Sequence, residues 1–418
     1  MVKRRVVITG LGISAPTGTG KEAFWQACKE GRSGVKSITR FNTEGYSSKI
    51  AGEVRDFDPL DYMSPKKAKR SDRFTQFAIA SAKMAIEDSH LNLEKVFKDR
   101  IGVFFGAAMG GMPFAEMQHS IFVEKGLKRV SPFLAESIFP GATSCQIAIE
   151  LDLKGINNTI STGCSSGADA IGQALDALRS ERADIIIAGG TEDPLGPLTF
   201  ASFCVIKALT TSNGEPEKAT KPFDLKRNGF ALSEGAGALV LETLEHAEKR
   251  GAKIYAELAG YGCSCDAYHM VQPSPDGVEL GNAIKHALND AQIIPDDVDY
   301  INAHGTSTVL NDVAETKAIK SVFGELAYFI PISSIKSSIG HTWGAAGAVE
   351  AIASVLAIQD QFIPPTINYE TADPECDLDY VPNKGRHARV DVIISNSASF
   401  GGKNSVLVIR KFQEDYGV

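Results

Sequence analysis

Short apolar runs alternate with amphipathic stretches along the first half of the chain. The runs predict strands over residues 5–9, 101–105, 158–161 and 185–188. Apolar or small residues at helical spacing predict helices over residues 71–89 and 168–178. The first strand is expected to end in a turn at Gly10-Leu11-Gly12. Apolar strands between amphipathic helices indicate an α/β fold whose sheet is covered on both faces.

The same alternation begins again after about residue 250. It predicts strands over residues 256–261, 300–302, 392–395 and 405–409, and helices over 281–290 and 343–359. Two halves of comparable make-up suggest an internal duplication, although no sequence repeat is detectable. We therefore place two units at residues 1–250 and 251–418. Because no Pro- or Ser-rich linker separates them, we expect the halves to pack tightly together.

The composition narrows the classes of protein. A hydrophobic fraction of 43% and a net charge of −8 argue against disorder and against a nucleic-acid partner. The sequence contains no run of 18 apolar residues, which argues against a membrane-spanning helix, and no signal-peptide pattern follows MVKRRVVITG. We expect a cytoplasmic protein that binds neither a membrane nor a nucleic acid. The seven cysteines form no CxxC pair, which argues against a disulfide framework and a structural zinc site.

Cys164 is the cysteine whose surroundings indicate chemistry. An apolar strand ends at Gly163-Cys164, small residues follow, and a helix begins. The positive end of that helix dipole is predicted to lower the pKa of the thiol and so favour the nucleophilic thiolate. The alternative is a cysteine that only packs at the end of a strand, and this segment alone does not choose between them.

Two histidines stand at junctions between predicted elements. His304 follows the strand predicted over residues 300–302, and His341 precedes the helix predicted from Trp343. A lone histidine is more often structural than catalytic, but functional side chains concentrate on such loops. Glycines beside both histidines and beside Cys164 fit a close approach of the backbone to a ligand.

Taken in order, three motifs resemble one family. They are Cys164, the loop from His304 through Gly305-Thr306-Ser307 to Thr308, and Lys336 five residues before His341. This set resembles the β-ketoacyl-acyl-carrier-protein synthases, which are condensing enzymes with the thiolase fold, and the resemblance covers essentially the whole chain. It implies duplicated βα-rich halves in a layered α-β-α-β-α architecture, the first carrying the cysteine and the second the histidines.

The resemblance implies an acyltransferase that performs a decarboxylative Claisen condensation. Cys164 would carry the acyl chain, because a thiolate exchanges thioesters readily. His304 and His341 would donate to the enolate that forms when malonyl-acyl-carrier protein loses CO2. The backbone N–H groups of Cys164 and Phe400 would hold the tetrahedral oxyanion. No metal and no separate cofactor is implied, since the substrates arrive on the phosphopantetheine arm of acyl carrier protein.

Supporting roles follow from the same resemblance. Lys336 would support the histidines electrostatically, with Glu350 hydrogen-bonded nearby, and the alternative is a buried structural ion pair. Thr306 and Thr308 would line the entrance for the pantetheine arm, and the alternative is a hydrogen-bonded turn. Met109 would lie at the bottom of the acyl pocket near a partner subunit, and the alternative is simple core packing there.

The segment around the nucleophile favours one branch of the family. Residues 162–167 read Thr-Gly-Cys-Ser-Ser-Gly, similar to the Thr-Gly-Cys-Thr-Ser-Gly of type II polyketide ketosynthases; fatty-acid enzymes usually carry Thr-Ala-Cys-Ala-Thr-Gly. Residues 344–350 and Asn396-Ser397 are closer to the fatty-acid enzymes. We favour a polyketide ketosynthase paired with a chain-length-factor subunit, with a homodimeric fatty-acid synthase II as the alternative. A non-catalytic chain-length factor is disfavoured, because such subunits lack the cysteine.

The loop before the last strand departs most from the fatty-acid pattern. Those enzymes read Asn-Ser-Phe-Gly-Phe-Gly-Gly-Thr-Asn where residues 396–404 read Asn-Ser-Ala-Ser-Phe-Gly-Gly-Lys-Asn. The gate residue Phe400 is kept, but Ala398 replaces a phenylalanine and Ser399 replaces a glycine that would let the loop swing. Trp343 stands where leucine is usual. These changes put ordinary gating of the acyl chain in question, though not condensation itself.

Overall fold

A computed structural model describes residues 3–414. Eleven strands form its main sheet: β1 (Val6–Ala15), β2 (Gly18–Thr19), β5 (Ile101–Gly106), β6 (Asn157–Ile160), β7 (Ile185–Glu192), β9 (Gly235–Thr243), β10 (Ala256–Cys265), β11 (Tyr300–Asn302), β12 (Ile332–Ser333), β15 (Val392–Ser399) and β16 (Lys403–Arg410). The described residues also form two smaller sheets. One consists of β3 (Val35–Ser37), β4 (Ile50–Gly52) and β8 (Leu232–Ser233), and the other pairs β13 (Phe362–Ile363) with β14 (Arg386–His387).

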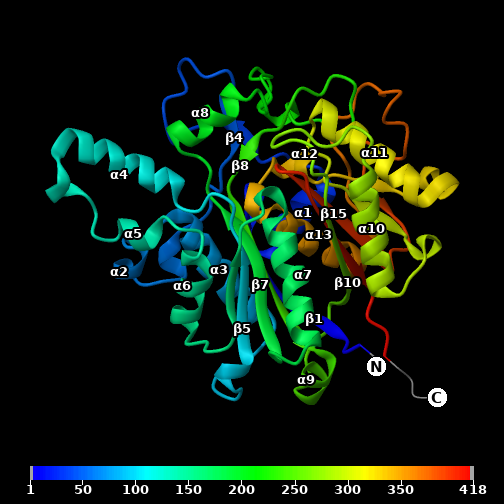
Figure 1. Cartoon of the computed structure of the whole chain (residues 1–418), viewed down its shortest axis with the longest axis horizontal. Coiled ribbons are helices and arrows are strands. Elements are labelled where there is room, and N and C mark those ends of the chain that lie inside the picture. Colours follow the sequence, from blue (N-terminus) through cyan, green and yellow to red (C-terminus); the bar gives the residue numbers. More distant parts are fainter. Residues whose placement is uncertain (1–2, 415–418) are drawn as a thin grey trace.

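Four helices cover the main sheet. They are α3 (Arg73–Asp88), α7 (Ser166–Arg179), α10 (Val278–Ala291) and α13 (Ala346–Asp360). The others are α1 (Lys21–Glu30), α2 (Pro65–Ala68), α4 (Met112–Lys125), α5 (Leu134–Ser137), α6 (Ala142–Leu151), α8 (Pro197–Val205), α9 (Leu244–Lys249), α11 (Val309–Phe323) and α12 (Lys336–Ile339). In Figure 1, α4 projects to the left, away from the sheet.

The two halves repeat one strand arrangement. The main sheet runs β12-β11-β15-β16-β10-β1-β9-β7-β5-β6. Read outward from the centre, one arm is β1-β9-β7-β5-β6 and the other is β10-β16-β15-β11-β12, so equivalent strands of the two halves follow in the same order. In each arm the first strand pairs antiparallel with the last, and the register shifts beside an early glycine, at Gly10 in β1 and at Gly260 in β10. The duplicated α/β fold predicted from the pattern and from the resemblance is confirmed.

The helices give the layers of this fold. Helix α3 packs on β1 and β9 of the first arm, and α10 packs on β10 and β16 of the second. Helices α7 and α13 pack against each other between the arms. Small residues make this contact close: a Cβ on Gly347 would lie 2.5 Å from the Ala168 nitrogen, and one on Gly167 would lie 2.9 Å from the Ala348 nitrogen. The boundary expected near residue 250 falls between α9 and β10.

The turn predicted at Gly10-Leu11-Gly12 is wrong, because β1 continues to Ala15. These glycines allow α3 to approach the strand closely. A Cβ on Gly10 would lie 2.1 Å from the Ala85 carbonyl oxygen, and one on Gly12 would lie 2.0 Å from that of Ser81. Glycine therefore serves helix–strand packing here rather than a change of chain direction.

Two expectations from composition can be placed on the fold. All seven cysteines are free thiols. Over residues 3–414, no helix has both the length and the apolar character needed to cross a bilayer.

Candidate active site

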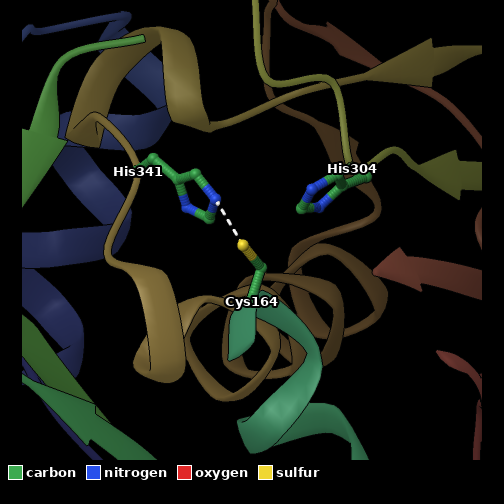
Figure 2. Close-up of side chains that lie close together, drawn as sticks. All are labelled: Cys164, His304 and His341. Atoms are coloured by element: carbon green, nitrogen blue, oxygen red, sulfur yellow. Dashed lines mark hydrogen bonds between the residues drawn. The ribbon is translucent and has the colours of Figure 1, made fainter. Parts of the chain in front are cut away.

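Three chain segments from both halves converge on one buried point. Cys164 lies in a 3-10 turn, Gly163–Ser165, between β6 and α7, and this turn needs the left-handed φ of +69° that Gly163 supplies. His304 follows β11, and His341 follows α12. Figure 2 shows the two imidazoles facing the thiol from opposite sides.

The distances make this group a reactive cluster. The Cys164 Sγ lies 3.2 Å from the Nε2 of His341, and the two imidazole centroids are 5.5 Å apart. The backbone N–H of Trp343 donates to the Nδ1 of His341 at 3.2 Å. Because Nδ1 accepts this bond, a neutral His341 carries its proton on Nε2 and donates toward the sulfur.

A buried aspartate orients the turn that carries the nucleophile. Asp169, one turn into α7, accepts hydrogen bonds from the hydroxyls of Thr162 at 2.5 Å and Ser165 at 2.9 Å. The Tyr261 hydroxyl from β10 donates to its other oxygen at 2.8 Å. The second half of the chain therefore helps to fix the residues on either side of Cys164. Sequence reasoning did not single out Asp169 or Tyr261.

Glu315 holds the loop of His304 and was also missed from the sequence. Its carboxylate accepts the backbone N–H groups of His304 and Gly305, both at 2.8 Å, and the Asn396 side-chain amide at 3.1 Å. Burial raises the pKa of this carboxyl. The available signal was a glutamate among the apolar residues of α11, eleven positions after His304.

Lys336 and Glu350 form a buried ion pair behind the histidines. The two side chains are 0% and 1% exposed. The Lys336 ammonium also donates to the His304 carbonyl oxygen at 2.5 Å, which links the pair to the loop. Burial raises the pKa of Glu350 to about 7, against the attraction of Lys336. The structure thus places both residues beside the His304 loop, and this contact fits either the supporting role that the resemblance implies or a structural ion pair.

The charge states in the resting site differ from the expectation for Cys164. Burial raises the pKa of the Cys164 thiol to about 12, although the charge of Lys336 and hydrogen bonds from Ser399 and the Phe400 backbone act against it. The predicted low thiol pKa is therefore wrong, because the side chain is only 3% exposed and its desolvation outweighs the helix dipole. Burial also lowers the pKa of His304 and His341 well below the ordinary value, so both imidazoles are neutral.

This burial predicts the pH dependence of alkylation at Cys164. The rate with a small alkylating agent should rise about tenfold per pH unit from about pH 7 to pH 10, because the thiolate remains a minor species below a pKa of about 12. No inflection should appear near the pKa of an ordinary histidine. Mass spectrometry of the Cys164 peptide measures the rate, and a plateau reached below about pH 8 would contradict the assignment.

A cavity of about 470 Å³ leads from the surface to this cluster. Its lining includes Cys164, His304, His341, Thr306, Thr308 and Phe400. The hydroxyls of Thr306 and Thr308 lie 2.8 Å apart. Met109 is not among the lining residues; its half-buried side chain packs on the apolar cluster that contains Cys164 and Trp343. Trp343 contacts the Phe400 ring edge-on, with centroids 5.1 Å apart.

Comparison with known families gives the geometry its context. Residues 3–247 match the Beta-ketoacyl synthase, N-terminal domain, and residues 255–370 match the Beta-ketoacyl synthase, C-terminal domain. The chain belongs to the β-ketoacyl synthase family. It is an acyltransferase, and its thiol and two imidazoles come from the regions that these two matches cover.

Relatives of this β-ketoacyl synthase come from two kinds of system. The chain is 47% identical to a 3-oxoacyl-[acyl-carrier-protein] synthase 2 of Coxiella burnetii and 46% identical to one of Synechocystis, over 98% of this chain and 99% of each relative. Among solved structures, it resembles a type II polyketide ketosynthase in complex with its acyl-carrier protein (AntDE:AntF), with a TM-score of 0.89 and 41% identity, over 99% of this chain and 100% of the other. The ishigamide ketosynthase/chain length factor gives a TM-score of 0.93 and 38% identity over the same shares.

Proposed function

We propose that this protein extends a fatty acyl chain by two carbons, condensing malonyl-acyl-carrier protein with an acyl group held on Cys164. The observation that carries the proposal is the position of the Cys164 Sγ. It lies 3.2 Å from an imidazole Nε2, with the second imidazole close by, at the inner end of a 470 Å³ cavity. A nucleophile beside two neutral N–H donors suits thioester exchange followed by enolate formation.

In the proposed first half-reaction, Cys164 takes the acyl group from its carrier. The sulfur attacks the thioester carbonyl, and the proton of the thiol ends on the departing pantetheine thiol. The Nε2–H of His341 stabilises the sulfur as its negative charge develops. Because burial keeps the resting thiol neutral, the thiolate is a minor species at neutral pH, and the thiol loses its proton in the course of the attack.

In the proposed second half-reaction, the malonyl thioester enters past Thr306 and Thr308. Loss of CO2 leaves an enolate, whose oxygen accepts hydrogen bonds from His304 and His341. Neutral imidazoles suit this role, because each donates a proton without placing a fixed positive charge in the buried site. The enolate carbon then attacks the acyl-Cys164 carbonyl, and Cys164 leaves as thiolate.

The proposed chemistry needs no metal and no separate cofactor. The ligand atoms of Cys164, His304 and His341 lie within 4.8 Å of one another, and such a set is also suited to zinc. A zinc ion there would occupy the sulfur that must carry the acyl group. We therefore assign these atoms to acyl transfer, with the substrates delivered on the phosphopantetheine arm of acyl carrier protein.

The comparisons support a fatty-acid role better than the polyketide role favoured from the residues around Cys164. The relatives at 46–47% identity are 3-oxoacyl-[acyl-carrier-protein] synthases 2, whereas the polyketide ketosynthases are 38–41% identical. The Ser165-Ser166 pair is a small local difference, and identity over 98% of the chain carries more weight. We infer that the enzyme acts on fatty acyl chains as a homodimer.

A polyketide ketosynthase remains the second candidate. It is favoured by the Thr-Gly-Cys-Ser-Ser-Gly segment and by the likeness to a ketosynthase solved with a chain length factor. In that case a chain-length-factor subunit would be the partner, in place of a second copy of this chain.

Purification of this chain alone distinguishes the two. We expect a homodimer that elongates acyl groups on acyl carrier protein with malonyl-acyl-carrier protein and no other subunit. The measurements are mass by light scattering and product identification by mass spectrometry. A chain that condenses only when a second, different subunit is added would favour the polyketide role, and a chain that condenses in neither case would contradict both.

Met109 provides a prediction about chain length. Met109→Trp should restrict products to short acyl chains without lowering the rate on the shortest primer, because a larger ring near the Cys164 cluster reduces space for the chain. Met109→Leu, which conserves volume, should keep the normal distribution. Product lengths of all three proteins are compared with the same substrates. An unchanged distribution for Met109→Trp at normal activity would place the limit elsewhere.

A further inference from the structure

Ser399 occupies a position that the proposed reaction requires. Its hydroxyl oxygen accepts the backbone N–H of Cys164 at 2.8 Å. Under the proposed function this N–H must instead donate to the oxygen of the tetrahedral intermediate. A backbone N–H has one proton, so the serine hydroxyl and the substrate oxygen compete for it.

The surrounding turn is shaped to receive this hydroxyl. A Cβ on residue 163 would lie 2.2 Å from the Ser399 oxygen, so a side chain in place of Gly163 would displace it. Ser399 ends β15, pairs with Lys403 across the hairpin, and accepts the Gly402 N–H on its carbonyl at 3.0 Å. Its backbone is therefore held, and rotation about the Cα–Cβ bond alone can remove the hydroxyl from the Cys164 N–H.

The hydroxyl proton is left free by this arrangement. Because the oxygen accepts from Cys164, its own O–H can point toward the sulfur. A hydrogen bond from this hydroxyl lowers the pKa of the Cys164 thiol, against the larger effect of burial. One side chain thus contacts both the nucleophile and the N–H that must later stabilise the oxyanion.

We propose that Ser399 is a positioning residue that occupies the oxyanion-binding N–H of Cys164 in the resting enzyme and leaves it when an acyl thioester enters. The inference rests on the proposed function, since it assigns this N–H to the oxyanion. In the resting enzyme the Ser399 hydroxyl oxygen accepts this N–H, so the carbonyl oxygen of the substrate must displace the hydroxyl before the sulfur attacks. Removal of the hydroxyl should therefore favour acylation over reactions of the sulfur that need no oxyanion.

The test compares two reactions of the same thiol at the same pH. Acylation by an acyl-carrier-protein thioester needs the Cys164 N–H to stabilise the oxyanion. Alkylation by iodomethane forms no oxyanion, and iodomethane has no oxygen that could accept this N–H. The rates of both reactions rise equally with the fraction of Cys164 that is thiolate. The ratio of the two rates therefore reports only how well the Cys164 N–H stabilises the oxyanion. In Ser399→Ala the ratio of acylation to alkylation rate should rise about three- to tenfold, the range for loss of one competing neutral hydrogen bond.

Two variants control for the change of side chain. Ser399→Thr keeps the hydroxyl and should keep the wild-type ratio. Ser161→Ala removes a neighbouring hydroxyl that donates to the Ala108 carbonyl and not to Cys164, and it should leave the ratio unchanged. Circular dichroism spectra and melting temperatures verify that all variants fold alike.

The outcomes separate this inference from the proposed function. A ratio in Ser399→Ala within about twofold of wild type would overturn the role of Ser399 while wild-type acylation upholds the proposed function. A ratio that falls would also overturn it, because Ser399 would then assist the oxyanion. Failure of the wild-type protein to accept any acyl group would overturn both.

Discussion

Replacement of Cys164 by alanine is expected to abolish formation of the acyl-enzyme. The thiol is the nucleophile beside the His341 Nε2, and alanine offers no atom that can form a thioester. The fold should persist, because the change removes one buried sulfur from an otherwise intact turn held by Asp169. Intact-protein mass spectrometry after incubation with acyl-acyl-carrier protein gives the result directly.

Cys28 provides the matched control. It is fully buried, and burial raises its thiol pKa to about 12, as for Cys164. Cys28→Ala should still gain the acyl mass, which would show that position beside the histidines matters, not burial of a thiol. A Cys164→Ala protein that still gains the acyl mass would refute the assignment of the nucleophile.

Loss of either histidine should slow decarboxylation of malonyl-acyl-carrier protein strongly. His304→Ala and His341→Ala should each reduce the rate about 10²- to 10³-fold or more, the usual effect of removing an oxyanion donor. Acylation should suffer less, and less in His304→Ala, because His341 is the residue hydrogen-bonded to the sulfur. Release of CO2 and acyl-enzyme formation are measured separately for each variant.

His286 is a suitable control for these variants. It lies exposed on α10, where its ring contacts the Cys263 carbonyl oxygen, and it does not line the cavity that contains Cys164. His286→Ala should decarboxylate at the wild-type rate. If His304→Ala and His341→Ala also keep that rate, the proposed enolate-binding role is incorrect.

The fold could be predicted from the sequence wherever the pattern repeats along one element. The strands around residues 101–105 and 300–302 and the helix around 71–89 are confirmed, because burial on a sheet or helix face fixes their periodicity. Gly10 and Gly12 misled the prediction. Their small size serves the approach of α3, a helix about 70 residues away in sequence, and no local pattern carries that contact.

The candidate site shows the same limit. Motif order placed Cys164, His304 and His341 in the sequence, and the structure brings them together. Neither the raised thiol pKa nor the hydrogen bond from the Cys164 N–H to Ser399 could be derived from the sequence. Both depend on how completely the other half of the chain covers the turn. Glu315 was missed for the same reason, since its partners lie on another element.

The close contact of α7 with α13 has a consequence for the synthesis of this protein. The half that carries Cys164 leaves the ribosome first, with α7 packed on β5 and β7 but with the side of α7 that meets α13 still uncovered. That face finds its partner only after residues 346–360 have been made, because Gly347 must lie against Ala168. The early half therefore keeps this small-residue surface exposed until α13 has been synthesised, and exposed apolar surface of this kind is prone to aggregation until it is covered.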